Sequence, residues 1–379
     1  MGLDAASLPD FPWDLLTPYA QRARSHPGGI VDLSVGTPVD PTPPAVRAAL
    51  EGASGSPGYP PTAGTLALRE AVVDWFARRR GVPGLAEHQV LPTVGSKELV
   101  ALLPSMLGLG AGDAVVHPAA AYPTYDIGAR LAGARPVPSD DPVAVLDADD
   151  AVRLVWLNSP SNPTGEVMGV DRLAGVVAAA RRAQERHGHP VVVAADECYA
   201  ELAWTAPWAS RGVPSLLDPR VTGGHVTGLL VAYSLSKRSN LAGYRAAFVA
   251  GDPEIVGRLL EVRKHAGLMV PGPVQAAMVA ALGDDAHVAE QKERYARRRA
   301  VLRDALAQAG YVADGSEAGL YLWVRPEGGQ GSWETVSDLA DLGILVAPGA
   351  FYGDDVHVRV ALTATDERVD EAAARLSGA

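Results

Sequence analysis

Residues 229–250 read LLVAYSLSKRSNLAGYRAAFVA, and this stretch decides the fold. Its two ends, 229–233 and 246–250, are compact apolar runs that are typical of strands buried on both faces. Two similar runs, 154–157 and 191–194, come earlier in the chain. Strands that are apolar on both faces need helices on both sides, so these runs predict a mostly parallel central sheet sandwiched by helices.

Helix-like segments alternate with the apolar runs, which favours an α/β fold. In residues 65–80 the apolar side chains recur with the period of a helix, so that one face of the segment is apolar. A second helical segment spans 171–186, between two of the predicted strands. This order of strand, helix and strand is the unit of a wound sheet, in which helices join successive parallel strands.

The residue pattern of the chain changes after Pro253, where the alternation of apolar runs and helical segments ends. A helical, charge-rich section covers 289–309, and strand candidates at 320–324 and 357–362 follow, separated by a short helix. The prolines before residue 45 exclude a regular helix there and predict an extended arm. We therefore expect an N-terminal arm with part of a small domain (1–44), a large domain (45–264) and a smaller α+β domain (265–379).

Composition narrows the possible partners. The formal net charge of −11 argues against nucleic-acid binding, because neutralising phosphates requires a basic face. No run approaches the roughly 20 apolar residues of a membrane span and no signal-peptide pattern is visible, so we expect no membrane association and a cytoplasmic location. The single cysteine, Cys198, cannot form an internal disulfide, and no metal site is predicted. Small molecules are the expected partners.

Any chemistry that needs a side-chain primary amine must use one of only four lysines among the 33 basic residues. Lys292 lies in a polar helical segment and Lys264 has basic neighbours, so we expect a solvated charge at the first and a structural or electrostatic role for the second. Lys97 follows Gly95-Ser96 at a helix start, where free N–H groups and the helix dipole suit anion binding.

Lys237 differs from the other lysines because it follows an apolar strand and has hydroxyl groups on both sides. A lone lysine in this place is most often a solvated strand end. Here Ser234 and Arg245 could hold a phosphate group while the Lys237 amine reaches an aldehyde. Pyridoxal phosphate is a cofactor that carries both of these groups.

Two other predicted strands end in polar groups. Asp196 and Tyr199 follow the strand at 191–194, and ligands of open α/β sheets collect at the carboxyl ends of strands. An acid there can pair with the pyridine nitrogen of pyridoxal phosphate and keep the ring electron-poor, although an isolated Asp after a strand would more often cap a helix. Asn162 lies in a rigid turn before Pro163 and could form a wall of the same site.

Taken in their order along the chain, the motifs around these residues resemble those of the class I and II aminotransferases of fold type I. Among these enzymes, the chain resembles the N-succinyldiaminopimelate aminotransferases. The resemblance covers nearly the whole chain. Its motifs are Val35-Gly36-Thr37-Pro38, Gly58-Tyr59-Pro60, Gly95-Ser96-Lys97-Glu98, Asn162-Pro163-Thr164-Gly165, Asp196-Glu197-Cys198-Tyr199, Ser234-Leu235-Ser236-Lys237, Gly243-Tyr244-Arg245 and Val358-Arg359-Val360.

The resemblance implies that the cofactor is pyridoxal phosphate and that Lys237 forms a Schiff base with it. It also implies that Asp196 pairs with the pyridine nitrogen and that the ring of Tyr122 stacks on the pyridine. Hydrogen bonds to the oxygen on the cofactor ring are expected from Asn162 and Tyr199. The phosphate is then expected on the main-chain N–H groups of Ser96 and Lys97 and on Ser234 and Arg245.

The resemblance also implies how substrates and a second subunit complete the site. Arg359 matches the arginine that binds the substrate α-carboxylate, and Gly36 and Asn162 are the other expected substrate-binding residues. By itself, an arginine inside an apolar strand is more often a paired structural ion. Tyr59 matches a residue that reaches the cofactor phosphate of the neighbouring subunit, so a homodimer is expected.

For the reaction, the resemblance implies a ping-pong aminotransferase of lysine and diaminopimelate biosynthesis, with glutamate as donor and N-succinyl-2-amino-6-oxopimelate as acceptor. Aminotransferases for aspartate, alanine or LL-diaminopimelate, and a C–S β-lyase, would use the same cofactor residues and stay open. A transcriptional regulator that senses ligands with this fold would need a basic DNA-binding domain before it. A nicotinamide-dependent dehydrogenase is disfavoured, because no G-x-G-x-x-G follows the first strand.

Overall fold

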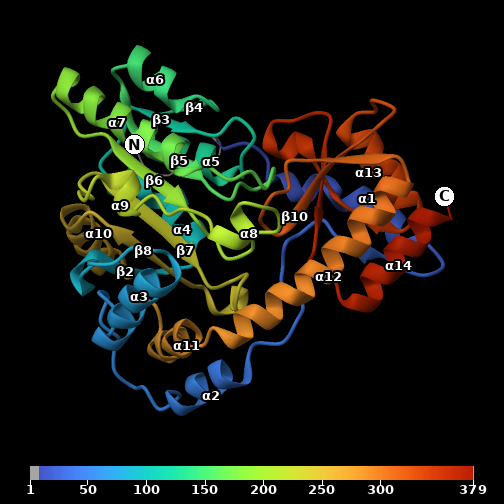
Figure 1. Ribbon diagram of the computed structural model, residues 1–379, viewed down its shortest axis with the longest axis horizontal. Helices are drawn as coiled ribbons and strands as arrows, with labels where there is room; N and C mark the ends of the chain where they lie inside the picture. Colours follow the sequence, from blue (N-terminus) through green and yellow to red (C-terminus); the bar gives the residue numbers. More distant parts are fainter. Residues whose placement is uncertain (1–7, 379) are drawn as a thin grey trace.

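The computed structural model describes residues 8–378 of the 379-residue chain, so the first seven residues of the expected N-terminal arm lie outside it. Two main sheets organise the described residues, one on each side of the molecule (Figure 1). No helix within residues 8–378 is long and apolar enough to cross a membrane. The same residues contain no cluster of three or more side chains suited to holding a metal ion.

The large sheet has seven strands, and the four apolar runs marked in the sequence form adjacent members of it. Neighbouring strands pair parallel except for β8, which runs antiparallel to both of its neighbours. The prediction of a mostly parallel sheet is therefore confirmed. In spatial order the strands are β2 (Val90–Val94), β8 (Ala246–Gly251), β7 (Leu229–Ser234), β6 (Val192–Asp196), β5 (Val152–Asn158), β3 (Ala114–His117) and β4 (Arg135–Pro138).

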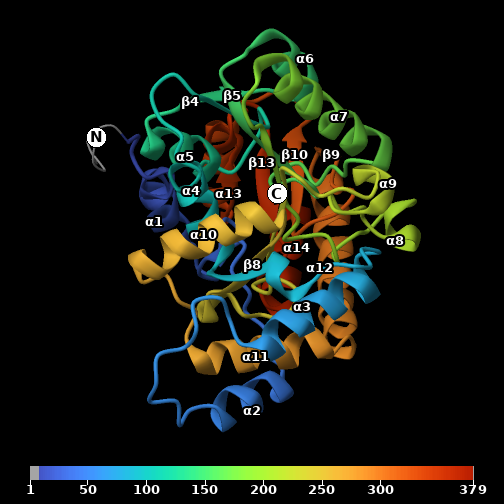
Figure 2. The same cartoon turned by 90° about the vertical axis from the view of Figure 1, so that its left-hand side faces the viewer.

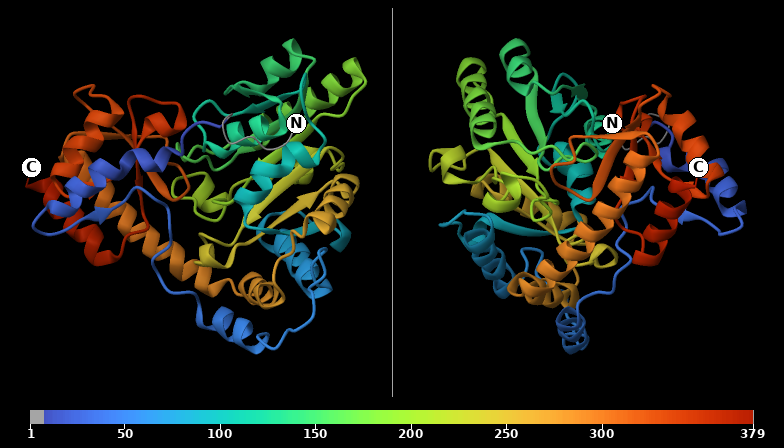
Figure 3. Two further views of the ribbon diagram at one scale, coloured as in Figure 1. Left: turned by 180° about the vertical axis from the view of Figure 1, so that it is seen from behind. Right: turned by 45° about the vertical axis from the view of Figure 1, so that its right-hand side comes forward.

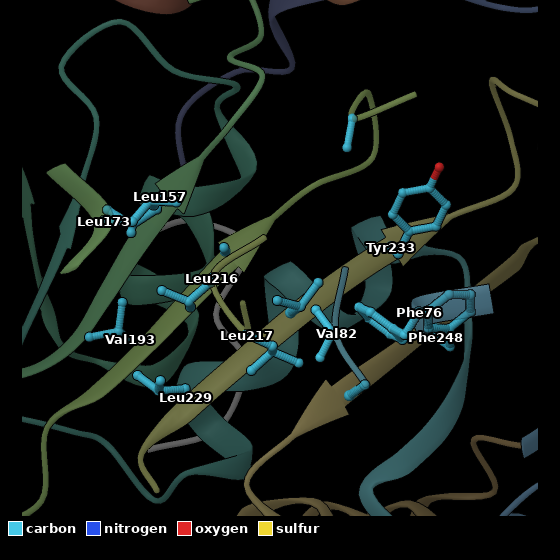
Figure 4. Packing of buried hydrophobic residues seen from close by; sticks show 14 of the residues in the cluster. Phe76, Val82, Leu157, Leu173, Val193, Leu216, Leu217, Leu229, Tyr233 and Phe248 are labelled. Atoms are coloured by element: carbon cyan, nitrogen blue, oxygen red, sulfur yellow. The ribbon is translucent and has the colours of Figure 1, made fainter. Parts of the chain in front are cut away.

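Both faces of this sheet are buried, which explains the apolar runs. Along β7, Val231 and Tyr233 belong to one hydrophobic cluster, whereas Leu230 and Ala232 belong to another. Successive side chains of a strand point to opposite faces, so a strand covered on both sides needs apolar residues throughout. Figure 4 shows part of the first cluster, where the rings of Tyr233 and Phe248 from neighbouring strands stack with centroids 5.6 Å apart.

Helices cover the two faces of the large sheet. α3 (Leu66–Arg79) and α7 (Val170–His187) pack on one face, and both confirm helices that the sequence periodicity predicts. The hydroxyl of Thr65 accepts the N–H of Leu68 at 3.3 Å, so this side chain caps the start of α3. The other face is covered by α4 (Ser96–Met106), α5 (Thr124–Ala132) and α10 (Pro253–Ala266).

Shorter helices complete the same half of the chain. α11 (Gly272–Gly283) contributes buried residues to the α3 side of the core and lies beside α2 (Pro44–Gly52), as Figure 2 shows. The remaining helices of this half are α6 (Pro142–Ala148), α8 (Trp208–Arg211) and α9 (Pro219–Thr222).

The small sheet has four antiparallel strands. In spatial order they are β12 (Ala347–Pro348), β13 (Val358–Ala361), β10 (Tyr321–Pro326) and β9 (Tyr311–Asp314), so both strand candidates of the C-terminal region are confirmed. α13 (Ser332–Asp341) lies between β10 and β13 in sequence, and α14 (Asp366–Ser377) follows β13. The long α12 (Ala286–Gln308), orange in Figure 3, runs from the vicinity of α11 to the small sheet.

The N-terminal segment packs with the C-terminal part of the chain. α1 (Thr17–Ser25) lies against α13, as the blue and orange ribbons of Figure 1 show. β1 (Val31–Asp32) pairs parallel with β11 (Ile344–Leu345) in a separate two-stranded sheet. Residues far apart in sequence therefore share one hydrophobic core around the small sheet.

The turn after β5 connects the large sheet to the segment that leads into β10. Thr164 accepts the N–H of Ser316 at 2.7 Å, and Gly165 accepts the N–H of Ala318 at 2.9 Å. Gly165 has a φ of 70°, and a Cβ added there would lie 2.5 Å from the carbonyl oxygen of Ala318. Only glycine combines this backbone conformation with this close approach.

A Gly165→Ala substitution should therefore destabilise the protein. The left-handed conformation of an alanine costs roughly 1–2 kcal/mol, and the contact with Ala318 adds to this cost. Gly175→Ala is the matched control, since Gly175 lies in α7 with nothing within 4 Å of an added Cβ. This variant should gain about 0.5–1 kcal/mol in urea unfolding followed by circular dichroism. Equal stability of the two variants would contradict the packing described here.

Candidate active site

A cavity of about 500 Å³ lies at the carboxyl ends of β5, β6 and β7. The last residue of each strand, respectively Asn158, Asp196 and Ser234, lines it. β10 and β13 contribute Tyr321 and Arg359, so both sheets border the same cavity. Ligands of open α/β sheets bind at this end of the strands.

The cavity brings together almost all the residues that the sequence singles out. Tyr59 is the exception, because it is 95% exposed on a loop and does not line the cavity. Its expected contact with a neighbouring subunit stays a prediction. The predicted residues that line the cavity are Gly36, Ser96, Lys97, Tyr122, Asn162, Asp196, Tyr199, Ser234, Lys237, Arg245 and Arg359.

The amine of Lys237 reaches the cavity from the segment after β7 and donates a hydrogen bond to the carbonyl oxygen of Gly36. Burial lowers the pKa of this amine. The guanidinium groups of Arg359 and Arg245 lower the pKa further, and Tyr321 opposes them. A lowered pKa increases the fraction of neutral amine at a given pH, and the neutral amine is the form that attacks an aldehyde.

The other lysines behave differently. Lys264 forms an exposed ion pair with Glu261 at 2.7 Å, a local electrostatic contact of the expected kind. Lys292 keeps partial contact with solvent, as expected of a surface charge, but its amine also lies 5.9 Å from the ring centroid of Trp204, and burial lowers its pKa. The amphipathic stem of a lysine packs readily on such a ring, which a polar sequence segment does not reveal.

The carboxylate of Asp196 is part-buried at the end of β6 and accepts two hydrogen bonds of well-defined geometry. One oxygen accepts the Tyr125 hydroxyl at 3.1 Å, and the other accepts the backbone N–H of Cys198 at 3.1 Å. A turn follows β6, and α8 begins only at Trp208, so the alternative of a helix cap is wrong. Burial raises the pKa of Asp196, while hydrogen bonds from the Cys198 thiol, the Cys198 backbone N–H and the Tyr125 hydroxyl lower it.

No lysine or arginine within residues 8–378 forms an ion pair with Asp196, although the carboxylate is part-buried and largely desolvated. Two carboxylates of the same segment contrast with it: Glu197 pairs with Arg80 at 2.7 Å, and Glu201 pairs with Arg238 at 2.7 Å. A buried carboxylate without a cation is costly. Asp196 therefore suits a ligand that carries a positive charge, such as a protonated pyridine.

In the same cavity, hydroxyls and a cation surround the start of α4. Gly95 precedes the helix with a φ of 78°, and a Cβ there would collide with the guanidinium of Arg245. Ser234 and Ser236 lie nearby in the lining, with their hydroxyls 2.8 Å apart. Free N–H groups at a helix start, hydroxyls and an arginine form an anion cradle that fits a phosphate group.

Arg359 crosses from the small sheet to the large one. Its Nη1 donates to Oδ1 of Asn162 at 2.9 Å, and its Nη2 donates to the carbonyl oxygen of Ser34 at 2.7 Å. The guanidinium lies 3.9 Å from the ring centroid of Tyr321 and 4.9 Å from that of Tyr352. In the described part of the chain it has no carboxylate partner, so the alternative of a paired structural ion is wrong. A carboxylate of a substrate would supply the missing charge.

Several residues that line the cavity were not predicted as site residues from the sequence. Tyr125 hydrogen-bonds Asp196, and Tyr321 lies with its hydroxyl 3.3 Å from that of Tyr199. Phe11 and Trp13 reach the cavity from the N-terminal segment. The one available signal was the spacing of Tyr125 from Tyr122 by three residues, which places both on one side of a helix start.

Taken together, the cavity fits pyridoxal phosphate. It contains an amine with a lowered pKa, a buried acid without a cation and an anion cradle. Each of these features matches one group of the cofactor, namely the aldehyde, the ring nitrogen and the phosphate.

The buried charge of Asp196 should reduce stability in the cofactor-free protein. Its pKa is raised in the folded state, so ionisation costs folding free energy at neutral pH, and this cost disappears as the pH falls toward the ordinary value of 3.8. Asp196→Asn should be more stable than wild type in urea unfolding at pH 7, with the difference vanishing in acid. Asp149→Asn should show the opposite sign, since a hydrogen bond from Arg135 lowers the pKa of Asp149. A destabilised Asp196→Asn at pH 7 would contradict the interpretation.

Comparison with known proteins agrees with this chemistry. The family model for aminotransferase class I and II matches residues 29–376. A 4-dedimethylamino-4-oxo-anhydrotetracycline transaminase of Streptomyces rimosus, OxyQ, is 56% identical over 372 residues, which are 98% of this chain and 99% of that protein. A probable aminotransferase of Mycobacterium tuberculosis is 57% identical over 375 residues, which are 98% of this chain and 86% of that protein.

A solved structure extends the likeness to three dimensions. A probable N-succinyldiaminopimelate aminotransferase from Thermus thermophilus superposes with a TM-score of 0.84 at 28% identity, covering 97% of this chain and 100% of that one. The family match spans both sheets and the cavity between them. The chain belongs to the class I and II aminotransferases and is a pyridoxal-phosphate-dependent enzyme of that family.

Proposed function

We propose that this aminotransferase transfers the amino group of glutamate to N-succinyl-2-amino-6-oxopimelate. The observation that carries the proposal concerns the cations at the cavity that have no carboxylate partner among the described residues: besides Lys237 and Arg245, which are assigned to the cofactor, these include the side chains of Arg359 and Lys97. An acceptor with a carboxylate beside the reacting carbon and another at its far end would pair with both. The likeness to the Thermus thermophilus protein supports the same substrate.

The inner half of the cavity holds the cofactor in this proposal. Pyridoxal phosphate supplies an aldehyde that exchanges amines and a ring that takes up electrons when the Cα–H bond breaks. Asp196 stabilises the proton on the ring nitrogen, and Tyr122 packs against the ring. Asn162 and Tyr199 hydrogen-bond the ring oxygen, whereas Ser96, Lys97, Ser234 and Arg245 hold the phosphate, the first two through main-chain N–H groups.

Lys237 performs the proton transfer. When its amine is not bonded to the cofactor, it would take up the proton from Cα of the substrate and hold it for return. The lowered pKa suits this role, because a base that works near neutral pH must be largely unprotonated there. Arg359 holds the α-carboxylate, together with Asn162 and the backbone of Gly36.

The outer half of the cavity, lined by Phe11, Trp13 and the Lys97 side chain, determines which acceptor binds in this proposal. The amine of Lys97 is exposed, donates to the hydroxyl of Tyr122 at 3.3 Å and lies 5.4 Å from the ring centroid of Phe11. Neither contact neutralises its charge, so the amine is available to a distal carboxylate. Trp13 adds an apolar wall to the same side of the cavity.

A second candidate follows from the 56% identity to OxyQ across nearly the whole length of both chains. The acceptor would then be a polycyclic ketone. Phe11, Trp13 and Tyr122 form a chain of aromatic rings at the cavity, with centroids 5.6 Å and 5.9 Å apart, and such rings favour planar substrates.

The assembly and location are part of the same proposal. Tyr59 is 95% exposed, and we infer a homodimer in which it reaches the site of the neighbouring subunit. A cytoplasmic location accords with the single buried thiol of Cys198.

Lys237→Ala should abolish the visible absorbance that wild-type protein acquires with pyridoxal phosphate, because no amine then condenses with the aldehyde at that position. Lys264→Ala is the control, since this exposed lysine pairs only with Glu261. Mass spectrometry after borohydride reduction should find the label on Lys237. A label on another lysine would overturn the assignment.

Measuring kcat/KM for a panel of acceptors, with glutamate as the amino donor, distinguishes between the candidate substrates. The succinylated keto acid should give kcat/KM values at least about ten-fold above oxaloacetate, pyruvate and the OxyQ ketone, since one hydrogen-bonded charge pair contributes this order of magnitude. Lys97→Gln should remove most of this preference while leaving pyruvate turnover near wild type. Faster turnover of the polycyclic ketone would favour the second candidate, and no transamination of any acceptor would contradict both.

A further inference from the structure

Tyr125 lies directly behind Asp196, at the start of α5. Its hydroxyl donates to Oδ2 of the Asp196 carboxylate at 3.1 Å. The Tyr125 side chain is only 2% exposed, and its ring packs against that of Trp156 with centroids 5.4 Å apart. Packing therefore holds the hydroxyl in one place, and the contact depends on a buried ring rather than on a mobile surface group.

This hydroxyl is the one side-chain O–H that hydrogen-bonds Asp196 among residues 8–378. The other donors are the thiol of Cys198 and its backbone N–H, the latter at 3.1 Å, and both belong to the turn after β6. Burial disfavours the charged form of Asp196, and the Cys198 thiol, the Cys198 N–H and the Tyr125 hydroxyl oppose burial. Without a cation in the protein, these donors stabilise the carboxylate.

We propose that Tyr125 is a positioning residue that keeps Asp196 ionised and aimed at the ring nitrogen of the bound cofactor. The inference rests on the proposed role of Asp196. One proton is shared between the ring nitrogen and the carboxylate, and it stays on nitrogen only while the carboxylate is the weaker base. Removing the Tyr125 hydroxyl makes the carboxylate more basic, so the proton moves from nitrogen to oxygen and the ring accepts electrons less readily.

The chain offers a matched control for this contact. Tyr233 is also buried, and its hydroxyl donates to Oε2 of Glu201 at 2.8 Å. Glu201 is neutralised by Arg238 and Arg79 and does not line the cavity. Tyr233→Phe therefore deletes the same kind of hydrogen bond, from a tyrosine hydroxyl to a buried carboxylate, without touching Asp196.

The test compares Tyr125→Phe with Tyr233→Phe in the holoenzyme. Each variant is loaded with pyridoxal phosphate labelled with ¹⁵N in the ring, and the ¹⁵N chemical shift reports whether that nitrogen is protonated. Tyr125→Phe should shift the signal toward the unprotonated value and lower kcat by about ten-fold or more, with KM for glutamate unchanged. Tyr233→Phe should leave the ¹⁵N signal at the wild-type position. The phenyl ring still fills the space beside Trp156, so circular dichroism should match wild type.

Asp196→Asn separates the inference from the function on which it rests. If this variant keeps both the protonated ¹⁵N signal and kcat, the proposed role of Asp196 is wrong. If Asp196→Asn loses them while Tyr125→Phe retains the wild-type signal, the role of Tyr125 alone is overturned. Loss of protonation in both tyrosine variants would also overturn it, because the effect would then be a general consequence of deleting a buried hydroxyl.

Discussion

The pairing of β5, β6 and β7 as parallel neighbours is the constraint on which the site depends. Parallel strands end at the same edge of a sheet, so the register that sets Asn158 beside Asp196 also sets Asp196 beside Ala232 of β7. The segment with Lys237 follows β7 directly. An acid and an amine from separate strands thus meet at one cavity, and apolar side chains on both faces of the sheet hold these ends in place.

Buried charges in this protein fall into two groups that the tertiary structure treats differently. Glu197 and Glu201 are neutralised by arginines within the chain, which offsets the cost of burying them. Asp196 and Arg359 have no such ionic partners in the described residues and instead line the cavity. A cofactor and a substrate that supply the opposite charges would offset the cost of leaving Asp196 and Arg359 unpaired.

The two halves of the cavity differ in what their residues are proposed to bind: the inner half the cofactor, the outer half the distal part of the substrate. The inner half contains the groups that any reaction of this cofactor needs, and family membership accounts for them. The outer half is built from Phe11, Trp13 and Lys97, which come from the N-terminal segment and the start of α4.

The sequence by itself determined the wound sheet, since continuous apolar runs mark strands buried on both faces, and it singled out Lys237 as the candidate for the Schiff base, because few lysines compete for the role. It also indicated Asp196 and Asn162, which lie next to strand ends. Only the tertiary structure decided that Tyr125 supports Asp196, that Arg359 meets Asn162 across the two sheets and that β1 pairs with β11. The physical reason is that local patterns report burial and backbone conformation, whereas these contacts depend on how distant segments pack against one another.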